Sequence, residues 1–327
     1  MTTTRTCAVA TLVALSSAGC WSTDDSQIGN DEPFRIQNAQ FVEGKLVGKS
    51  IEDAGSNPPP QSDTGPPGTT SPKTTQLAYF PGQTGASFTG DTTTNAVAVG
   101  LAMDGVGTGY WVLPVNGPDP ATGRLGWAAT IDFGRNLPIG RRNLRVVAID
   151  KRGRGGEQAV VSLCIKGLVP DNLQSCSPKR VPPEAVISLS WDVNADLDLQ
   201  VIGPDGRLLE PKHSTTQKLM DGGAPVMAPA SFDHDSNANC AGDAFRMENL
   251  VWQTERPVGR YRIYANLFDA CKQPAVNFDV SVFDSEGATD SGPPHLVEKL
   301  TARGELLDIS ANGGSQRGLF VTEYVFR

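Results

Sequence analysis

The sequence predicts an all-β protein with two β-sandwich domains, which follow an export signal and a proline-rich linker. Three observations support this prediction. Apolar residues alternate with polar ones in short runs, the period of a half-buried strand. Turn-forming residues separate these runs at spacings of about ten residues, as in sandwich proteins. Glycine (35 residues) and proline (24 residues) are abundant, and we expect almost no helix longer than two turns.

Composition and charge set limits on the domain count and on the class of partner. The chain has 327 residues, of which 39% are hydrophobic, enough for two domains that each have a core. Its formal net charge is −8. A nucleic-acid partner would require a basic face, so we expect none. Solubility is the simplest explanation of the acidic balance.

Residues 1–19 have the features of a bacterial lipoprotein signal. Arg5 is the only charged residue before an apolar run at residues 8–15, which is too short to span a bilayer permanently. The sequence Ser17-Ala18-Gly19-Cys20 resembles a lipobox, in which the cysteine becomes the lipidated first residue; Ser17 stands where leucine is usual. We therefore expect a membrane anchor at Cys20. Ordinary signal-peptidase cleavage after Ala18 is the alternative.

Residues 20–76 are predicted to be mainly a flexible linker rich in Pro, Gly and Thr. Residues 34–42 (FRIQNAQFV) form one candidate short strand, able to pair with a later domain. Residues 57–72 (NPPPQSDTGPPGTTSP) contain prolines that remove hydrogen-bond donors and small residues that bury little. This stretch predicts an extended spacer.

Residues 77–180 are predicted to form the first sandwich. After residues 137–140 (LPIG), a Val/Ala/Asp strand and a Gly-rich turn resemble the end of bacterial immunoglobulin-like modules. The resemblance implies an immunoglobulin-like fold. Its expected strands are residues 96–103, 110–115, 127–133, 143–150 and 159–165.

Residues 184–327 are predicted to form the second sandwich, which opens with residues 188–206 (SLSWDVNADLDLQVIGPDG). This stretch predicts two strands joined as a hairpin and closed by a turn. Asp196 and Asp198 then lie on one strand face, about 7 Å apart. Further expected strands are residues 249–253, 259–269 and 275–284, with residues 298–308 paired to 318–326 and loops over 213–230 and 230–243.

Five separated segments of this second domain resemble the YfaP-like family, an uncharacterised bacterial β-sandwich domain. They are the Trp-Asp pair at 191–192, residues 196–206 (DLDLQVIGPDG), Asp233-His234-Asp235, Glu248-Asn249, and residues 257–261 (PVGRY), with Gln200 standing where the family commonly has His. The resemblance implies the sandwich fold for residues 184–327. It implies little about function, because the family's function is largely unknown.

Four cysteines remain after Cys7 is lost with the signal and Cys20 takes a lipid. An even number of cysteines in an exported protein indicates two disulfides, for which three pairings exist. We expect the sequence-local pairs Cys164–Cys176 and Cys240–Cys271. A zinc site is a poor alternative, because the chain has no CxxC motif and its histidines lie far from the cysteines in sequence.

Acidic and amide side chains of the second domain form the strongest chemical cluster. Oxygen ligands in this number suit Ca²⁺. The spacing at 233, 235 and 237 also matches the first ligands of an EF-hand loop, but Ala238 and Ala244 stand where that loop needs Gly and Glu. Solvated carboxylates and loop-capping side chains are the alternative. The candidate ligands are Asp196, Asp198, Asp233, Asp235, Asn237 and Glu248.

The sequence offers little for catalysis. Its histidines are His213, His234 and His295, and no GxSxG, HExxH or phosphate-binding glycine loop occurs. We therefore expect a non-catalytic lipoprotein of a Gram-negative cell envelope, anchored in the membrane, that presents a surface to an envelope protein or polysaccharide. A carbohydrate or peptidoglycan module would require an exposed indole at Trp111, Trp127 or Trp252; a hydrolase would require a cleft that joins His213 or His234 to two carboxylates.

Overall fold

The computed structural model describes residues 31–49, 65–212, 230–243, 245–287 and 293–327. Within these ranges the protein is all-β, with nineteen strands and two three-residue 3-10 turns, η1 (Ala238–Cys240) and η2 (Asp308–Ser310). The predicted fold class is therefore confirmed. No helix among the described residues has the length and apolar character that crossing a bilayer requires.

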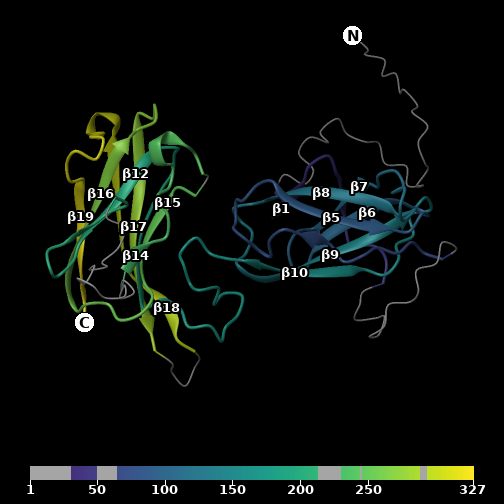
Figure 1. Ribbon diagram of the computed structural model, residues 1–327, viewed down its shortest axis with the longest axis horizontal. Coiled ribbons are helices and arrows are strands. Elements are labelled where there is room, and N and C mark those ends of the chain that lie inside the picture. The colour runs from purple at the N-terminus through teal and green to yellow at the C-terminus, as the bar shows by residue number, and fades with distance from the viewer. Residues whose placement is uncertain (1–30, 50–64, 213–229, 244, 288–292) are drawn as a thin grey trace, which may run out of the picture. The chain divides into compact units, whose positions relative to one another are not determined.

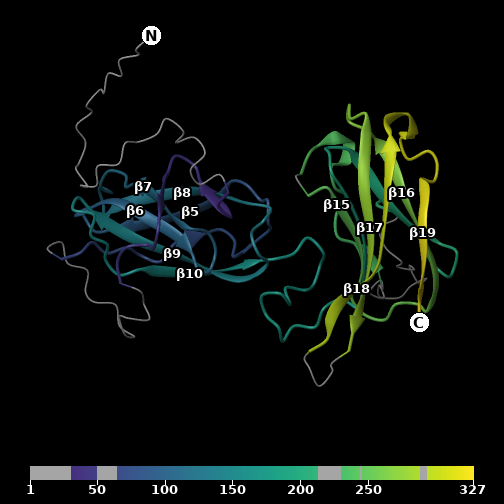
Figure 2. The same ribbon diagram turned by 180° about the vertical axis from the view of Figure 1, so that it is seen from behind.

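The first sandwich consists of a four-stranded and a six-stranded sheet (Figures 1 and 2). The four-stranded sheet has the order β1 (Phe34–Ile36), β8 (Leu125–Phe133), β5 (Ala86–Thr92), β3 (Lys73–Thr74). The six-stranded sheet has the order β2 (Gln40–Glu43), β7 (Gly109–Pro114), β6 (Ala96–Met103), β9 (Gly140–Asp150), β10 (Ala159–Ile165), β4 (Ala78–Tyr79). All pairs are antiparallel except β10–β4.

Aromatic side chains fill the space between these two sheets. Trp127, Phe88 and Tyr79 are fully buried. The indole of Trp127 lies against Gly90, its partner on β5, where an added Cβ would come within 2.7 Å of the ring. Position 90 must therefore be glycine for the Trp127 indole to pack there, and the absence of a side chain is part of the core.

The N-terminal segment departs from our prediction of one short strand over residues 34–42. It forms two strands in opposite sheets: β1 pairs with β8, and β2 pairs with β7. Asn38, which lies between them, has φ 58°, a left-handed conformation that Asn tolerates and that turns the chain from one sheet to the other. Both are edge strands, too short for a clear periodic signal. The predicted pairing of this segment with a later domain is present, but it involves two strands and not one, and β3 also lies within the predicted linker.

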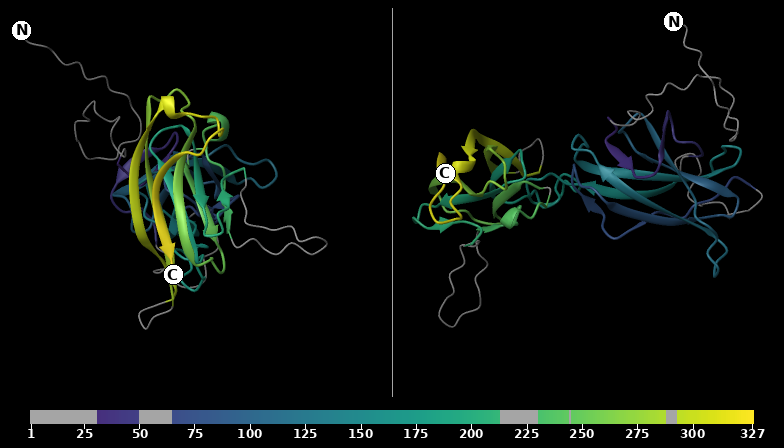
Figure 3. Two further views of the ribbon diagram at one scale, coloured as in Figure 1. Left: turned by 90° about the vertical axis from the view of Figure 1, so that its left-hand side faces the viewer. Right: turned by 90° about the horizontal axis from the view of Figure 1, so that it is seen from above.

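The second sandwich consists of a five-stranded and a four-stranded sheet (Figures 1 and 3). The five-stranded sheet has the order β14 (Ala230–Phe232), β15 (Met247–Trp252), β11 (Ala185–Trp191), β17 (Ala275–Glu286), β18 (His295–Leu307). The four-stranded sheet has the order β13 (Leu208–Leu209), β12 (Asp196–Ile202), β16 (Gly259–Asp269), β19 (Leu319–Phe326). Both sheets are antiparallel throughout.

Two predicted pairings in this sandwich are wrong. Strands β11 and β12 form no hairpin, because β11 pairs with β15 and β17 while β12 pairs with β13 and β16. The chain crosses between the sheets at residues 192–195, where the Trp191 indole N–H donates to the carbonyl of Ala195 at 3.0 Å. The last two strands likewise pair with β17 and β16 instead of each other. Alternation reports which face of a strand is buried and says nothing about its partner.

Both expected disulfides are present. Cys164–Cys176 joins the end of β10 to the following segment, and Cys240–Cys271 joins η1 to the end of β16. They close loops of 12 and 31 residues. In the chain-entropy model each such bond stabilises the fold by about 3 to 4 kcal/mol. The second bond matters for the site, because it fastens a loop that carries Asp235.

Candidate functional site

Three aspartates gather on the outer side of the four-stranded sheet of the second sandwich. Leu197, Leu199 and Val201 of β12 are fully buried in the core, so Asp196 and Asp198 face the other way. Asp235 comes from the loop over residues 233–243. One carboxylate oxygen from each of the three aspartates lies within 4.8 Å of the other two. The structure thus brings together three of the six predicted ligands.

A β-bulge shapes the strand at this point. Asp196 is in register with Asp269 and Leu197 with Leu267, which leaves Phe268 of β16 without a partner. Such a bulge bends the strand and re-aims neighbouring side chains. Here it lies beside Asp196, whose side chain is buried although it is an acid.

The loop over residues 233–243 is fastened to β12 by several hydrogen bonds. The Asn239 N–H donates to Asp196 Oδ2 at 2.6 Å, and Asn237 Nδ2 donates to the Ala195 carbonyl at 3.1 Å. Asn237 Oδ1 in turn accepts from the Asp243 N–H at 3.1 Å. Asn237 and Asn239 both have φ above 50°, in the left-handed region that Asn tolerates. With the disulfide to Cys271, these contacts hold Asp235 opposite the two strand aspartates.

The aspartates of this cluster are poorly compensated. Burial raises the pKa of Asp198 to about 7; a hydrogen bond from Asn266 opposes the shift, and the charges of Asp196 and Asp235 add to it. Burial also raises the pKa of Asp196 to about 6, with the charges of Asp235 and Asp269 contributing. The pKa of Asp235 is raised by burial too. Since three carboxylates repel one another in a partly desolvated place, the cluster favours either protons or a bound cation.

Glu248 lies behind these aspartates, fully buried between the sheets. Its Oε2 accepts a hydrogen bond from the Leu199 N–H at 2.7 Å, and the N–H of Ser236 also acts to lower the pKa of this carboxyl. Among the described residues, Oε1 has no hydrogen-bond partner. Burial raises the pKa of this carboxyl well above its ordinary value, and the charges of Asp198 and Asp235 raise it further. Glu248 thus belongs to the same electrostatic unit as the three aspartates.

Lys212, which the sequence did not single out, supplies one positive charge to this unit. Its charge acts to lower the pKa of Asp196, Asp198 and Asp235. Its ammonium lies over the ring of Phe268, 4.9 Å from the centroid. The charge of His234 also acts to lower the pKa of Asp235. These two positive groups face three aspartates and Glu248, which leaves the cluster negative. No sequence pattern relates position 212 to this cluster, because the contact depends on how the chain returns after β13.

Two of the predicted ligands lie elsewhere. Asp233 Oδ1 accepts from the Asn249 N–H at 3.0 Å and its Oδ2 accepts from Asn249 Nδ2 at 2.8 Å, so this carboxylate joins the loop to β15. Asn237 uses both side-chain polar atoms in the loop contacts described above. Of the three residues at 233, 235 and 237, only Asp235 therefore faces the cluster. Asp233 and Asn237 hold the loop in place.

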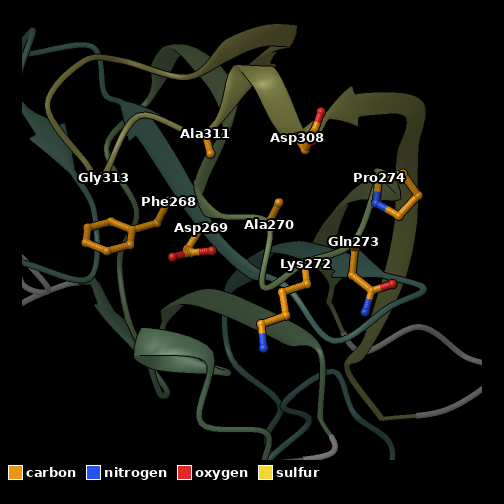
Figure 4. A pocket seen from close by; sticks show the side chains of 9 residues that line it. All are labelled: Phe268, Asp269, Ala270, Lys272, Gln273, Pro274, Asp308, Ala311 and Gly313. Carbon is orange, nitrogen blue, oxygen red and sulfur yellow. The ribbon is translucent and has the colours of Figure 1, made fainter.

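A shallow pocket lies next to the cluster, at the end of β16 (Figure 4). It begins at Asp269, which is in register with Asp196. Its lining is mixed, with Asp269, Asp308 and Lys272 carrying charges. The full lining is Phe268, Asp269, Ala270, Lys272, Gln273, Pro274, Asp308, Ala311 and Gly313.

The histidines and tryptophans are placed as follows. His234 Nδ1 lies 3.0 Å from Asp233 Oδ1, and its Nε2 is buried without a hydrogen-bond partner among the described residues, beside the ring of Phe245. His295 is exposed on β18, and His213 and Cys20 lie outside the described residues. The three indoles that could have offered a sugar platform are all buried: Trp111, Trp127 and Trp252.

Comparison with known proteins adds little about function. No protein-family model matches the chain, and no curated protein does. Among solved structures, the C-terminal domain of the AgI/II polypeptide BspA of Streptococcus agalactiae is similar at 10% identity and a TM-score of 0.23, over 73% of this chain and 99% of that one. Fibronectin(III)-like modules of Clostridium thermocellum CbhA match at 10% identity and 0.18, over 75% and 96%. Likeness at this level carries no argument about function.

Proposed function

We propose that this protein is a non-catalytic lipoprotein of the bacterial cell envelope whose second sandwich presents a binding surface. The supporting observation is the open side of that sandwich. Strands β18 and β19 end their respective sheets and contact each other. Large apolar side chains are exposed along this side, although apolar groups normally turn inward. They are Leu307, Ile309, Leu319, Phe320 and Val325.

An exposed strand edge offers unpaired N–H and C=O groups, to which an added strand or an extended partner can bind. Strand β18 is 13 residues long and β19 is eight, longer than the short edge strands by which many sandwiches avoid such contact. Phe320 is half exposed and packs one side of its ring against Tyr264 at 5.5 Å between centroids. A rigid aromatic residue of this kind is a typical interface anchor.

The described residues do not supply the observations that would have favoured the two alternatives, and His213 lies outside them. A sugar-stacking platform requires an exposed indole, and the three candidate indoles are buried. A hydrolase requires a histidine that faces two carboxylates across a cleft, and the free nitrogen of His234 is buried beside Phe245. The anchor at Cys20, the export and the YfaP-like relationship rest on the sequence alone and belong to the same proposal.

Sedimentation with isolated envelopes tests the proposal once the anchor has been removed. The full chain with Cys20→Ala should lose lipid labelling and leave the membrane fraction. It should still bind isolated envelopes saturably, and the additional change Phe320→Lys should abolish that binding, because the charge blocks the apolar strand edge. Ile139→Lys, an equally exposed apolar position in the first sandwich, is the matched control and should bind normally. A Cys20→Ala chain that never binds envelopes would contradict the binding role.

A further inference from the structure

We propose that Asp196, Asp198 and Asp235 form a calcium site on the second sandwich, with Glu248 as its buried inner wall. The site is independent of the strand edge formed by β18 and β19. It also narrows the wider set of acids predicted from the sequence, because Asp233 and Asn237 hold the loop and do not face the cluster.

The spacing of the oxygens fits a calcium ion. Calcium–oxygen distances in proteins are about 2.3–2.6 Å, so two oxygens on opposite sides of the ion lie about 4.6–5.2 Å apart. The three aspartate oxygens all lie within 4.8 Å of one another. This upper limit is compatible with an ion that contacts all three oxygens, with at most a small adjustment of the side chains.

Glu248 is the independent observation that this cluster awaits a cation. A buried polar atom normally has a hydrogen-bond partner, yet Oε1 of Glu248 has none among the described residues and the side chain is fully buried. Its other oxygen is held by the N–H of Leu199, the residue that follows Asp198. The carboxyl group is thereby held close enough to the cluster for the charges of Asp198 and Asp235 to raise its pKa. A cation, or a water bound to one, would satisfy that atom and neutralise the neighbouring carboxylates together.

The chemistry of the donors favours calcium over other common ions. All donors are hard carboxylate oxygens, whereas zinc sites typically include His or Cys. The neighbouring Cys240 and Cys271 are joined to each other and unavailable as thiolates. Magnesium requires near-ideal octahedral geometry and gives up its waters reluctantly. A site assembled from one strand and one loop suits the more permissive coordination of calcium.

The competing explanation is that the ammonium of Lys212 already serves as the counter-ion of the three aspartates. Its charge acts on all three aspartates, but its ammonium also lies over the Phe268 ring. If calcium is the ligand, the unaltered chain should already bind it, and removing this charge should improve binding; if Lys212 is itself the partner, the unaltered chain should bind no calcium.

Titration calorimetry of the full Cys20→Ala chain with calcium chloride tests the site. We expect saturable binding of one ion with Kd of roughly 10⁻⁴ to 10⁻³ M, and weaker binding of magnesium. Asp198→Asn keeps the side-chain shape but removes a ligand charge. Glu248→Gln can still accept the hydrogen bond from the Leu199 N–H, but it replaces the carboxyl group beside the cluster with an uncharged amide. Each should weaken calcium binding about tenfold or more. Asp279→Asn, an exposed acid of β17 paired with Arg303, should not change it.

A second pair of measurements keeps the test decisive if a variant folds poorly. Lys212→Met leaves every oxygen in place and should tighten calcium binding at least about threefold. In chelator, Asp198→Asn should melt at or above the temperature of the unaltered chain, because the amide removes a charge that burial disfavours. No saturable heat from the unaltered chain, equal weakening by Asp279→Asn, or unchanged binding in Lys212→Met would each overturn the site.

Discussion

Asp150 in the first sandwich and Asp196 in the second are both buried, with 6% and 3% of the residue exposed. Their pKa values nevertheless shift in opposite directions. Asp150 accepts hydrogen bonds from the N–H groups of Arg152 and Arg154 at 2.8 and 2.9 Å and from Arg154 Nε at 2.8 Å. Burial acts to raise its pKa, but these bonds outweigh burial and the pKa is lowered. The pKa of Asp196 is raised to about 6. The hydrogen-bond partners of a buried acid, together with its desolvation, decide the direction in which its pKa moves.

The comparison also separates a structural acid from one available for binding. At Asp150 the chain supplies its own cation within four residues, so the turn from β9 is complete in itself. At Asp196 the chain supplies more carboxylates and one backbone donor, the Asn239 N–H. The acids of the second sandwich therefore depend on something added, either protons or an ion.

The largest expected effect concerns the covalent support of the acidic loop. Replacing both Cys240 and Cys271 by Ala removes a 31-residue closed loop, which should lower the free energy of unfolding by about 3 to 4 kcal/mol. It should also weaken calcium binding, because Asp235 loses its pre-organisation. Denaturant unfolding with and without calcium measures both. Replacing Cys164 and Cys176 is the matched control; it should destabilise the chain without changing calcium affinity, and an equal change in affinity would refute the special role of the second bond.

The next largest effect is a dependence on pH in chelator. Asp196 and Asp198 have folded pKa values of about 6 and about 7, above their ordinary value. The folded state therefore binds more protons than the unfolded one, and stability falls as pH rises from about 4 to about 7. Thermal melts at pH 5 and pH 8 should differ in this direction, and calcium or Asp198→Asn should reduce the difference. Melts that rise with pH in chelator would contradict the raised pKa values.

Asp150 should behave in the opposite way. Since its folded pKa is lowered, its contribution is present above its ordinary pKa of about 4 and is lost as the pH falls through the folded value. Asp150→Ala should lower the free energy of unfolding at pH 7 by about 2 kcal/mol, because two backbone N–H groups and Arg154 lose a charged acceptor. Calcium should not restore it. A variant as stable as the unaltered chain at pH 7 would show that the turn does not need this acid.

The smallest effect is stabilisation by calcium itself. With Kd of roughly 10⁻⁴ to 10⁻³ M, about 1 mM calcium stabilises the folded chain by only roughly 0.4 to 1.4 kcal/mol. We expect a small rise in melting temperature that chelator reverses and that Asp235→Ala abolishes. In Asp233→Ala the rise should persist, because that carboxylate holds the loop to β15 instead of facing the cluster. Loss of the rise in both variants would return Asp233 to the ligand set.

Strand positions could be read from the sequence because alternation of apolar residues is a local property. The expected strands at residues 96–103, 159–165 and 259–269 have the bounds of β6, β10 and β16. The common face of Asp196 and Asp198 followed from the same alternation. Pairing could not be read in this way, since the crossing at residues 192–195 depends on packing of Trp191 against a carbonyl four residues later.

The candidate site was predictable only where its residues share a strand. The direction of the Asp235 side chain depends on the left-handed conformations of Asn237 and Asn239 and on the disulfide that closes a 31-residue loop. For this reason Asp235 faces the cluster, although Asp233, two positions earlier, does not. The depth of Glu248 depends on which backbone N–H group its carboxyl reaches, here that of Leu199 on the opposite sheet. The contribution of Lys212 depends on the return of the chain after β13. These are long-range contacts that residue type and spacing do not encode.

The division of the N-terminal segment between two sheets has a mechanical consequence. If Cys20 is tethered to a membrane, tension on the chain first reaches Glu32, which accepts hydrogen bonds from Thr108, and then β1, which is held to β8 by three register pairs from Phe34 to Ile36. Detachment of β1 would break the hydrogen bond that the Trp111 indole N–H donates to the Phe34 carbonyl at 3.0 Å. Strand β2 lies beyond the Asn38 turn in the opposite sheet, so the pull must reverse direction before it reaches the second attachment. Under such a load, the two short strands would therefore detach one after the other and not together.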